Sequence, residues 1–148
     1  MSILDLFRVD GQVAVITGSG RGIGRAITIA LAEAGADVVI TSRRAEEVAA
    51  VAAEVRALGR RALELPGDLK KPGMPKELAE AAIAEFGRLD IWINNAGGTD
   101  DAHVQPMTVT TDDQMRDMFE LNLIAAAAAS REAATICALN LLGKTWSR

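Results

Sequence analysis

Short apolar runs alternate along the chain with longer stretches in which apolar residues recur at helical spacing. Each run is four or five residues long and is closed by glycine, proline or polar residues. A continuous apolar run of this length predicts a strand that is buried on both faces of a sheet. The predicted strands are Val13–Thr17, Asp37–Thr41, Ala62–Leu65 and Leu89–Ile93.

The stretches between these runs predict helices. Apolar residues recur three or four positions apart, and a glycine follows each stretch as a C-terminal stop. The first helix carries Ile23, Ile27, Leu31 and Ala34, the second carries Val48, Val51, Val55 and Leu58, and the third spans Pro72–Phe86. Residues 98–110 are expected to form a loop.

A fourth helix is predicted to begin at Thr111. Thr111 and Gln114 fit a capping box, in which each side chain bonds a free backbone N–H of the first helical turn. The helix then carries Met115, Met118, Phe119, Asn122 and an alanine run that ends at Ala129. The leucines at 139, 141 and 142 fit either a short strand or an extension of this helix.

The order of predicted elements is strand and helix in four alternating pairs. The connections are too long for hairpins, which favours parallel strands joined by right-handed crossovers. The fold class is therefore α/β, a doubly wound parallel sheet of the Rossmann type. No linker or internal repeat divides the chain, so residues 1–148 form a single domain.

Composition narrows the possible functions. The formal net charge of −4 argues against non-specific nucleic-acid binding, which needs a basic face. No apolar run reaches the roughly 20 residues of a membrane span, and the N-terminus does not resemble a secretory signal. The single cysteine excludes an internal disulfide, and with only one histidine we expect no metal-ligand cluster. We expect a cytoplasmic protein with neither membrane nor nucleic-acid partners.

The segment VAVITGSGRGIG, residues 13–24, joins the first predicted strand to the first helix. Its four glycines allow a sharp turn and a close approach of the backbone to phosphate groups. The N-terminus of the following helix adds unpaired N–H groups and a positive dipole end. The segment therefore predicts a dinucleotide phosphate site, and the alternative is a plain strand-to-helix turn.

The spacing T-G-x-x-x-G-x-G from Thr17 to Gly24 resembles that of the short-chain dehydrogenase/reductase family. Asp68-Leu69, Asn94-Asn95-Ala96-Gly97 and Asn122 are similar to later family motifs and occur in the same order. For Asp68 the resemblance implies adenine contact, although the residue could simply cap its turn. For Asn122 it implies a bend in the helix and a water held in a proton relay, the alternative being a polar residue bonded to backbone. The implied cofactor contacts are Gly18, Ser19, Arg21, Gly22, Ile23, Gly24, Ser42, Arg43, Asp68, Leu69, Asn95, Ala96 and Gly97.

The end of the second predicted strand reads Thr41-Ser42-Arg43-Arg44. An acidic residue at this place would bind the ribose 2′-OH of NAD, whereas a guanidinium binds the 2′-phosphate of NADP. Arg21 reaches the same phosphate by the family's geometry. We therefore expect NADP(H) in preference to NAD(H), with a solvated helix start as the alternative for the two consecutive arginines.

The resemblance implies hydride transfer between a nicotinamide and a small-molecule carbonyl or alcohol, with a Ser, a Tyr and a Lys handling the proton. The chain contains no tyrosine, and the family pattern would place all three residues beyond Arg148. We expect an incomplete Rossmann domain, truncated after about four strands and the next helix, with Asn122 as its one catalytic-set position. The open edge at Leu89–Ile93 predicts association, as a homo-oligomer or with a partner.

Three hypotheses follow: part of an NADP-dependent oxidoreductase that is inactive alone, a non-catalytic NADP-binding module, or a remnant without ligand. The remaining chemically distinctive side chains are not expected to take part in catalysis or binding. His103 is expected to be a solvated loop residue, and Cys137, Trp92 and Trp146 are expected to be packing residues. Lys144 and Ser147 are not assigned family roles.

Overall fold

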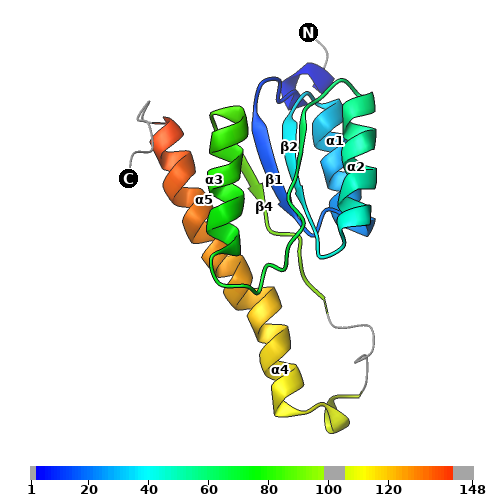
Figure 1. Ribbon diagram of the computed structural model, residues 1–148, viewed down its shortest axis with the longest axis vertical. Helices are drawn as coiled ribbons and strands as arrows, with labels where there is room; N and C mark the ends of the chain where they lie inside the picture. The colour runs from blue at the N-terminus through cyan, green and yellow to red at the C-terminus, as the bar shows by residue number, and fades with distance from the viewer. Residues whose placement is uncertain (1–2, 99–105, 142–148) are drawn as a thin grey trace.

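Four parallel strands form one sheet in the order β3-β2-β1-β4, shown in the computed structural model of Figure 1. The structure describes residues 3–98 and 106–141. The strands are β1 (Val13–Thr17), β2 (Asp37–Thr41), β3 (Ala62–Glu64) and β4 (Ile91–Ile93). The predicted parallel, doubly wound α/β sheet is confirmed.

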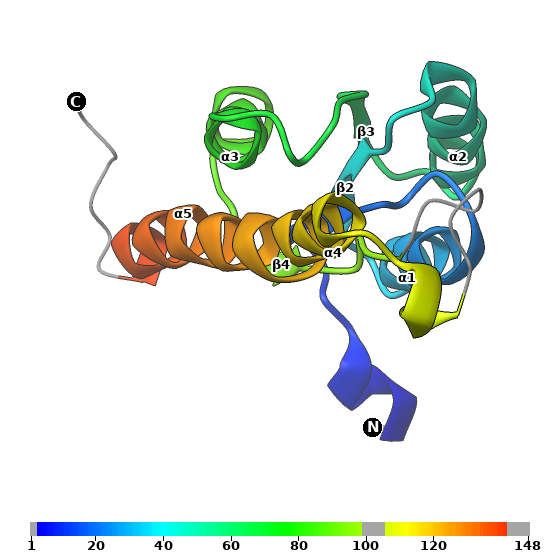
Figure 2. The same ribbon diagram turned by 90° about the horizontal axis from the view of Figure 1, so that it is seen from below.

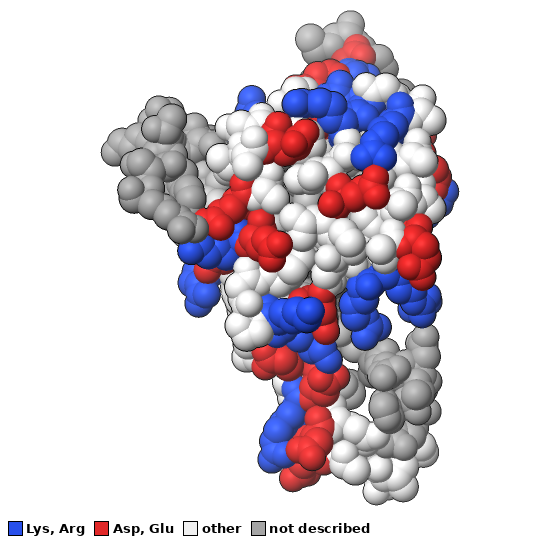
Figure 3. Space-filling view, in the orientation of Figure 1, with Lys and Arg blue, Asp and Glu red and all other residues white. Residues whose placement is uncertain are grey.

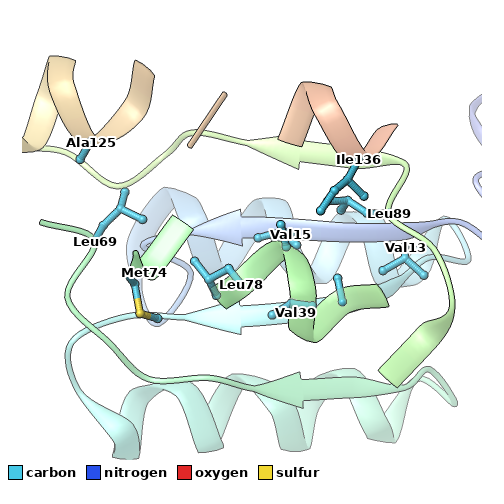
Figure 4. Close-up of a cluster of buried hydrophobic side chains, with 11 residues drawn as sticks. Val13, Val15, Val39, Leu69, Met74, Leu78, Leu89, Ala125 and Ile136 are labelled. Carbon is cyan, nitrogen blue, oxygen red and sulfur yellow. The ribbon is translucent and has the colours of Figure 1, made fainter. Parts of the chain in front are cut away.

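Helices cover both faces of the sheet, as the two views in Figures 1 and 2 show. The helices α1 (Gly22–Glu33) and α2 (Ala45–Ala57) lie on one face, and α3 (Met74–Phe86) and α5 (Ala125–Leu141) lie on the other. Alternate residues of β1 point to opposite faces, so the strand contributes to two hydrophobic clusters. Ala14 and Ile16 pack with α1 and α2, whereas Val13 and Val15 pack with α3 and α5. Figure 4 shows the second cluster, in which Leu78 of α3 and Ile136 of α5 meet the strands.

The helix α1 packs closely on the sheet because its buried face is made of small residues. Gly24, Thr28 and Ala32 are buried, while Ile27 is only partly buried. Ile23, at the start of the apolar pattern, is 75% exposed. The apolar spacing therefore predicts the helix correctly but does not mark the residues that lie deepest.

Several predicted boundaries differ from the structure by one or two residues; strand β3, for example, ends at Glu64, one residue before the predicted Leu65. Strand β4 begins at Ile91 instead of Leu89 because Asp90 bonds Val13 with both its backbone N–H and its side chain, at 3.0 and 2.9 Å. Helix α3 begins at Met74, two residues after the predicted Pro72. Leu58, predicted on the apolar face of α2, lies at the C-cap and is 44% exposed.

The fourth predicted helix is interrupted by a π-helical turn. Helix α4 (Asp112–Phe119) starts with the predicted capping box, in which Thr111 accepts from Gln114 N–H and the Gln114 side chain accepts from Thr111 N–H. The π turn (Glu120–Ile124, labelled η4) follows, and α5 continues to Leu141. The C-terminal leucines up to 141 thus extend a helix and form no strand.

Two short 3₁₀ helices, η1 (Ile3–Phe7) and η3 (Met107–Val109), lie in segments without a predicted helix.

Acidic and basic side chains are interspersed over the face seen in Figure 3. Among the helices of residues 3–98 and 106–141, none has the length and apolar character needed to cross a bilayer. Within the same residues β4 pairs only with β1, so the association expected at its open edge stays a prediction.

Candidate functional site

A groove of about 360 Å³ lies at the carboxyl ends of the strands. The chain passes from β1 to β2 on one side and returns to β4 on the other side, so the groove occupies the place where ligands bind in open α/β sheets. The turn after β1, the start of α2, and the loops after β3 and β4 form its walls. Of the predicted cofactor contacts it is lined by Gly18, Arg21, Gly22, Ile23, Gly24, Ser42, Arg43, Asp68, Leu69, Asn95, Ala96 and Gly97.

The glycine turn is packed so closely that a Cβ at Gly18, Gly20 or Gly24 would lie less than 3.0 Å from a neighbouring atom. A Cβ on Gly24 would lie 2.2 Å from the carbonyl oxygen of Gly18 and 2.5 Å from Nδ2 of Asn95. Gly18 has a φ of +67°, and a Cβ there would lie 2.9 Å from Cα of Ala96. The glycines therefore bring the turn against the loop after β4, with the N-terminus of α1 facing the groove.

Thr17 and Asn95 hold the glycine turn to the end of β4. Thr17 Oγ1 accepts from the backbone N–H groups of Asn95 and Ala96, both at 3.0 Å, and donates to Ile93 O at 3.2 Å. Asn95 Nδ2 donates to the carbonyl oxygens of Thr17 and Gly18 at 2.9 and 3.1 Å. Asn95 thus braces the end of β1 against the end of β4, and its predicted contact with the cofactor stays a prediction. Sequence reasoning missed the role of Thr17, although this residue opens the family motif.

Ser19 is the one predicted cofactor contact that does not line the groove. Its side chain is fully buried, and Oγ accepts from Thr41 N at 2.9 Å and donates to Thr41 O at 3.2 Å. The backbone N–H of Ser19 also donates to Thr41 O. The hydroxyl therefore fixes the glycine turn to the end of β2.

The end of β2 and the start of α2 bring three charged side chains to the groove. Arg43 is exposed and has no hydrogen bond or ion pair with any described residue. Arg44 forms an ion pair with Glu47 at 2.7 Å, and Ser42 Oγ accepts from Arg44 N at 3.3 Å. Sequence reasoning did not assign Glu47 to the groove, because its position three residues after Arg44 is also typical of a surface ion pair.

The loop after β3 forms a further wall. Asp68 Oδ1 accepts from the backbone N–H of Lys70 at 3.0 Å, while Leu69 is 8% exposed and packs into the hydrophobic cluster of α3 and α5. Lys70 lines the groove, and its ammonium forms an ion pair with Asp117 of α4 at 2.7 Å. Asp68 therefore caps its turn, as the alternative expectation holds, and also faces the groove. No sequence signal identified Lys70, whose partner is 47 positions away.

Asn122 lies in the π turn and fastens the loop after β4. Its Oδ1 accepts from Gly98 N at 2.8 Å, and its Nδ2 donates to Gly98 O at 2.9 Å and to Met118 O at 2.8 Å. The distortion of the helix at this residue matches the bend that the resemblance implies. All these partners are backbone groups, so a role in a proton relay stays a prediction.

Cys137 and Trp92 do not line the groove. Burial, together with the Asp90 carboxylate, raises the pKa of the Cys137 thiol, which donates to Leu89 O at 3.4 Å. Cys137 and Trp92 pack against the cluster of α3 and α5, as expected of packing residues. His103 and Trp146 lie outside the described residues. The part of the chain that is described holds no group of three or more potential metal ligands.

The closely packed glycine turn, the start of α1 beside it and the groove at the strand switch fit a dinucleotide. These features define a Rossmann-type nucleotide-binding fold. The chain belongs to the short chain dehydrogenase family, which matches residues 12–140.

The chain is similar in sequence to relatives that are about twice as long. An uncharacterized oxidoreductase of Mycobacterium tuberculosis is 48% identical over 128 residues, which are 85% of this chain and 47% of that protein. A versicolorin reductase of Emericella nidulans is 37% identical over 134 residues, 90% of this chain and 50% of its own. The chain thus spans about half the length of the curated relatives it matches.

Solved structures share the fold over the same extent. A 7α-hydroxysteroid dehydrogenase in complex with NADH and 7-oxo glycochenodeoxycholic acid matches with a TM-score of 0.86 and 34% identity, covering 95% of this chain and 53% of that one. A short-chain type dehydrogenase/reductase from Mycobacterium marinum matches with a TM-score of 0.84 and 32% identity, covering 92% and 54%.

Proposed function

We propose that this chain is the NADP(H)-binding part of a short-chain oxidoreductase that acts on a small-molecule carbonyl or alcohol. The observation that supports the cofactor preference is Arg43, which lines the groove at the end of β2 and whose guanidinium has no partner among the described residues. NAD-binding sites place a carboxylate at this point, which would repel a 2′-phosphate. A guanidinium binds a phosphate with charge-assisted, often bidentate hydrogen bonds.

Arg21 supports the same preference from the glycine turn. It lies in the glycine turn and lines the same groove as Arg43. The family alone does not decide between the two cofactors, because the related hydroxysteroid dehydrogenase was solved with NADH. The preference proposed here therefore rests on the arginines of this chain.

In this proposal the chain's residues bind and orient the dinucleotide. The glycine turn and the N-terminus of α1 hold the pyrophosphate, and Thr17 and Asn95 keep the turn in place. Asn122 fixes the loop after β4, which lines the other end of the groove. The bound NADP(H) would supply hydride exchange at its nicotinamide ring.

The substitution Arg43→Asp tests the cofactor preference. We expect it to weaken NADPH binding about 10- to 100-fold and NADH binding less than about threefold, because only NADPH carries the phosphate that Arg43 would hold. The measurement is a fluorescence titration of the 148-residue chain with each dinucleotide. Arg131→Asp on α5 is the control, since it makes the same charge change at an exposed residue that does not line the groove. An equal loss for both dinucleotides would contradict the proposed preference.

The lack of tyrosine predicts binding without turnover. The phenol that the family uses as its acid–base group is not among these 148 residues. We expect the purified chain to bind NADPH but to leave its absorbance unchanged in the presence of small ketones and aldehydes. Oxidation of NADPH that depends on both the chain and a carbonyl substrate would refute this expectation.

A further inference from the structure

Glu47 places a carboxylate in the wall of the groove. Its side chain is only 21% exposed, although it lies in the first turn of α2. A Cβ on Gly20 would lie 2.9 Å from Cβ and 3.0 Å from Oε2 of Glu47, and 2.6 Å from Oγ of Ser42. The carboxylate therefore stands between the glycine turn and the end of β2.

The same carboxylate holds the guanidinium of Arg44. Nη1 of Arg44 lies 2.7 Å from Oε1 of Glu47, and both side chains line the groove. The Arg44 side chain is 57% exposed, and its ion pair with Glu47 is what holds the guanidinium in this position. Of the two consecutive arginines, only Arg43 is left without an ionic partner in the described part of the chain.

Resting on the proposed NADP(H) site, we infer that Glu47 limits the affinity of this groove for the 2′-phosphate and so sets the strength of the cofactor preference. It does so in two ways. Its negative charge repels a phosphate at the end of β2, and its ion pair competes with that phosphate for Arg44. NADH lacks the 2′-phosphate, so neither the repulsion of that phosphate nor the competition for Arg44 affects its binding.

A double-mutant cycle on Glu47 and Arg44 tests the inference. Dissociation constants for NADPH and NADH are measured for the wild-type chain, Glu47→Gln, Arg44→Gln and the double variant. We expect Glu47→Gln to raise the preference for NADPH over NADH about 3- to 10-fold, since it removes the repulsion and releases Arg44. Arg44→Gln is expected to reduce NADPH affinity more in the Glu47→Gln background than in the wild type, because only there is Arg44 unpaired.

Glu46→Gln is the matched control. Glu46 lies in the same first turn of α2 and carries the same charge, but it is exposed and does not line the groove. We expect the Glu46→Gln variant to prefer NADPH over NADH as strongly as the wild type does. Thermal unfolding of each variant shows whether loss of a first-turn acid has weakened α2 itself.

The outcomes separate this inference from the proposed function. An unchanged preference in Glu47→Gln overturns the inference, whichever dinucleotide the wild type prefers. A wild type without preference for NADPH overturns the proposed cofactor, while a shift toward NADPH in Glu47→Gln still supports the role of Glu47. Binding of neither dinucleotide by any of the variants overturns both.

Discussion

The substitution Gly24→Ala is expected to weaken NADPH binding by about 100-fold. The new methyl group would lie 2.2 Å from the Gly18 carbonyl oxygen and 2.5 Å from Asn95 Nδ2. Both neighbours are held, because Asn95 Nδ2 donates to the carbonyl oxygens of Thr17 and Gly18. The glycine turn must therefore move, and overpacking of this kind costs up to about 3 kcal/mol, equal to roughly a 100-fold change in affinity. A fluorescence titration with NADPH measures the loss.

Gly59→Ala is a control that separates steric conflict in the groove from general damage. Gly59 follows α2, has a φ of +77°, and a Cβ there would meet no atom within 4 Å. Its replacement is expected to lower the free energy of unfolding by about 1 kcal/mol through backbone strain and to leave NADPH affinity unchanged. Circular dichroism shows whether Gly24→Ala keeps its helices. Wild-type affinity in a folded Gly24→Ala chain would show that the turn does not hold the dinucleotide.

The backbone of the site could be predicted from the sequence because glycine spacing constrains the backbone directly. The strand that ends at Thr17 and the helix after the turn place the segment at the carboxyl edge of the sheet, where the structure has it. Side-chain direction does not follow from such spacing. Ser19 lies between two groove-lining glycines, yet its hydroxyl points to Thr41 and away from the groove.

Contacts between distant segments were also beyond prediction. Lys70 and Asp117 are far apart in sequence, and neither belongs to a pattern that would pair them. Glu47 presents a similar difficulty, because its ion pair with Arg44 is local but its contact with the glycine turn depends on how α2 lies against α1. Sequence patterns thus predicted the elements and the edge of the site, whereas the polar contacts between elements required the three-dimensional arrangement.

The second large effect is expected on the free energy of unfolding and involves Asp37 at the start of β2. The carboxylate of Asp37 is 6% exposed and forms ion pairs with Arg60 and Arg61, each at 2.8 Å. It also accepts from the backbone N–H of Arg61 at 3.0 Å. Burial by itself raises the pKa of Asp37, but the hydrogen bonds from Arg61 and the charges of both arginines outweigh it and hold this pKa below the ordinary value of 3.8.

A lowered pKa in the folded state means that folding favours the ionised carboxylate. The stability that Asp37 contributes is therefore fully present above its unfolded pKa and is lost as the pH falls through the folded pKa. We expect Asp37→Asn to lower the free energy of unfolding by about 2 kcal/mol at neutral pH, since hydrogen bonds to a charged group are each worth about 1.5–3 kcal/mol. Below about pH 4 the difference in unfolding free energy between wild type and variant should shrink. The wild-type carboxylate then becomes protonated and is neutral, like the amide of the variant.

Urea unfolding at neutral pH and at two acidic pH values measures this difference. Asp113→Asn is the control, because Asp113 forms an ion pair with Arg116 at 2.8 Å in which both side chains are largely exposed. Exposed pairs contribute about 0–1 kcal/mol, so this variant should differ little from the wild type at any pH. A cost in Asp37→Asn that stays constant down to the lowest pH would mean that the amide disturbs packing. The charge of Asp37 would then contribute nothing to folding, contrary to the network at the start of β2.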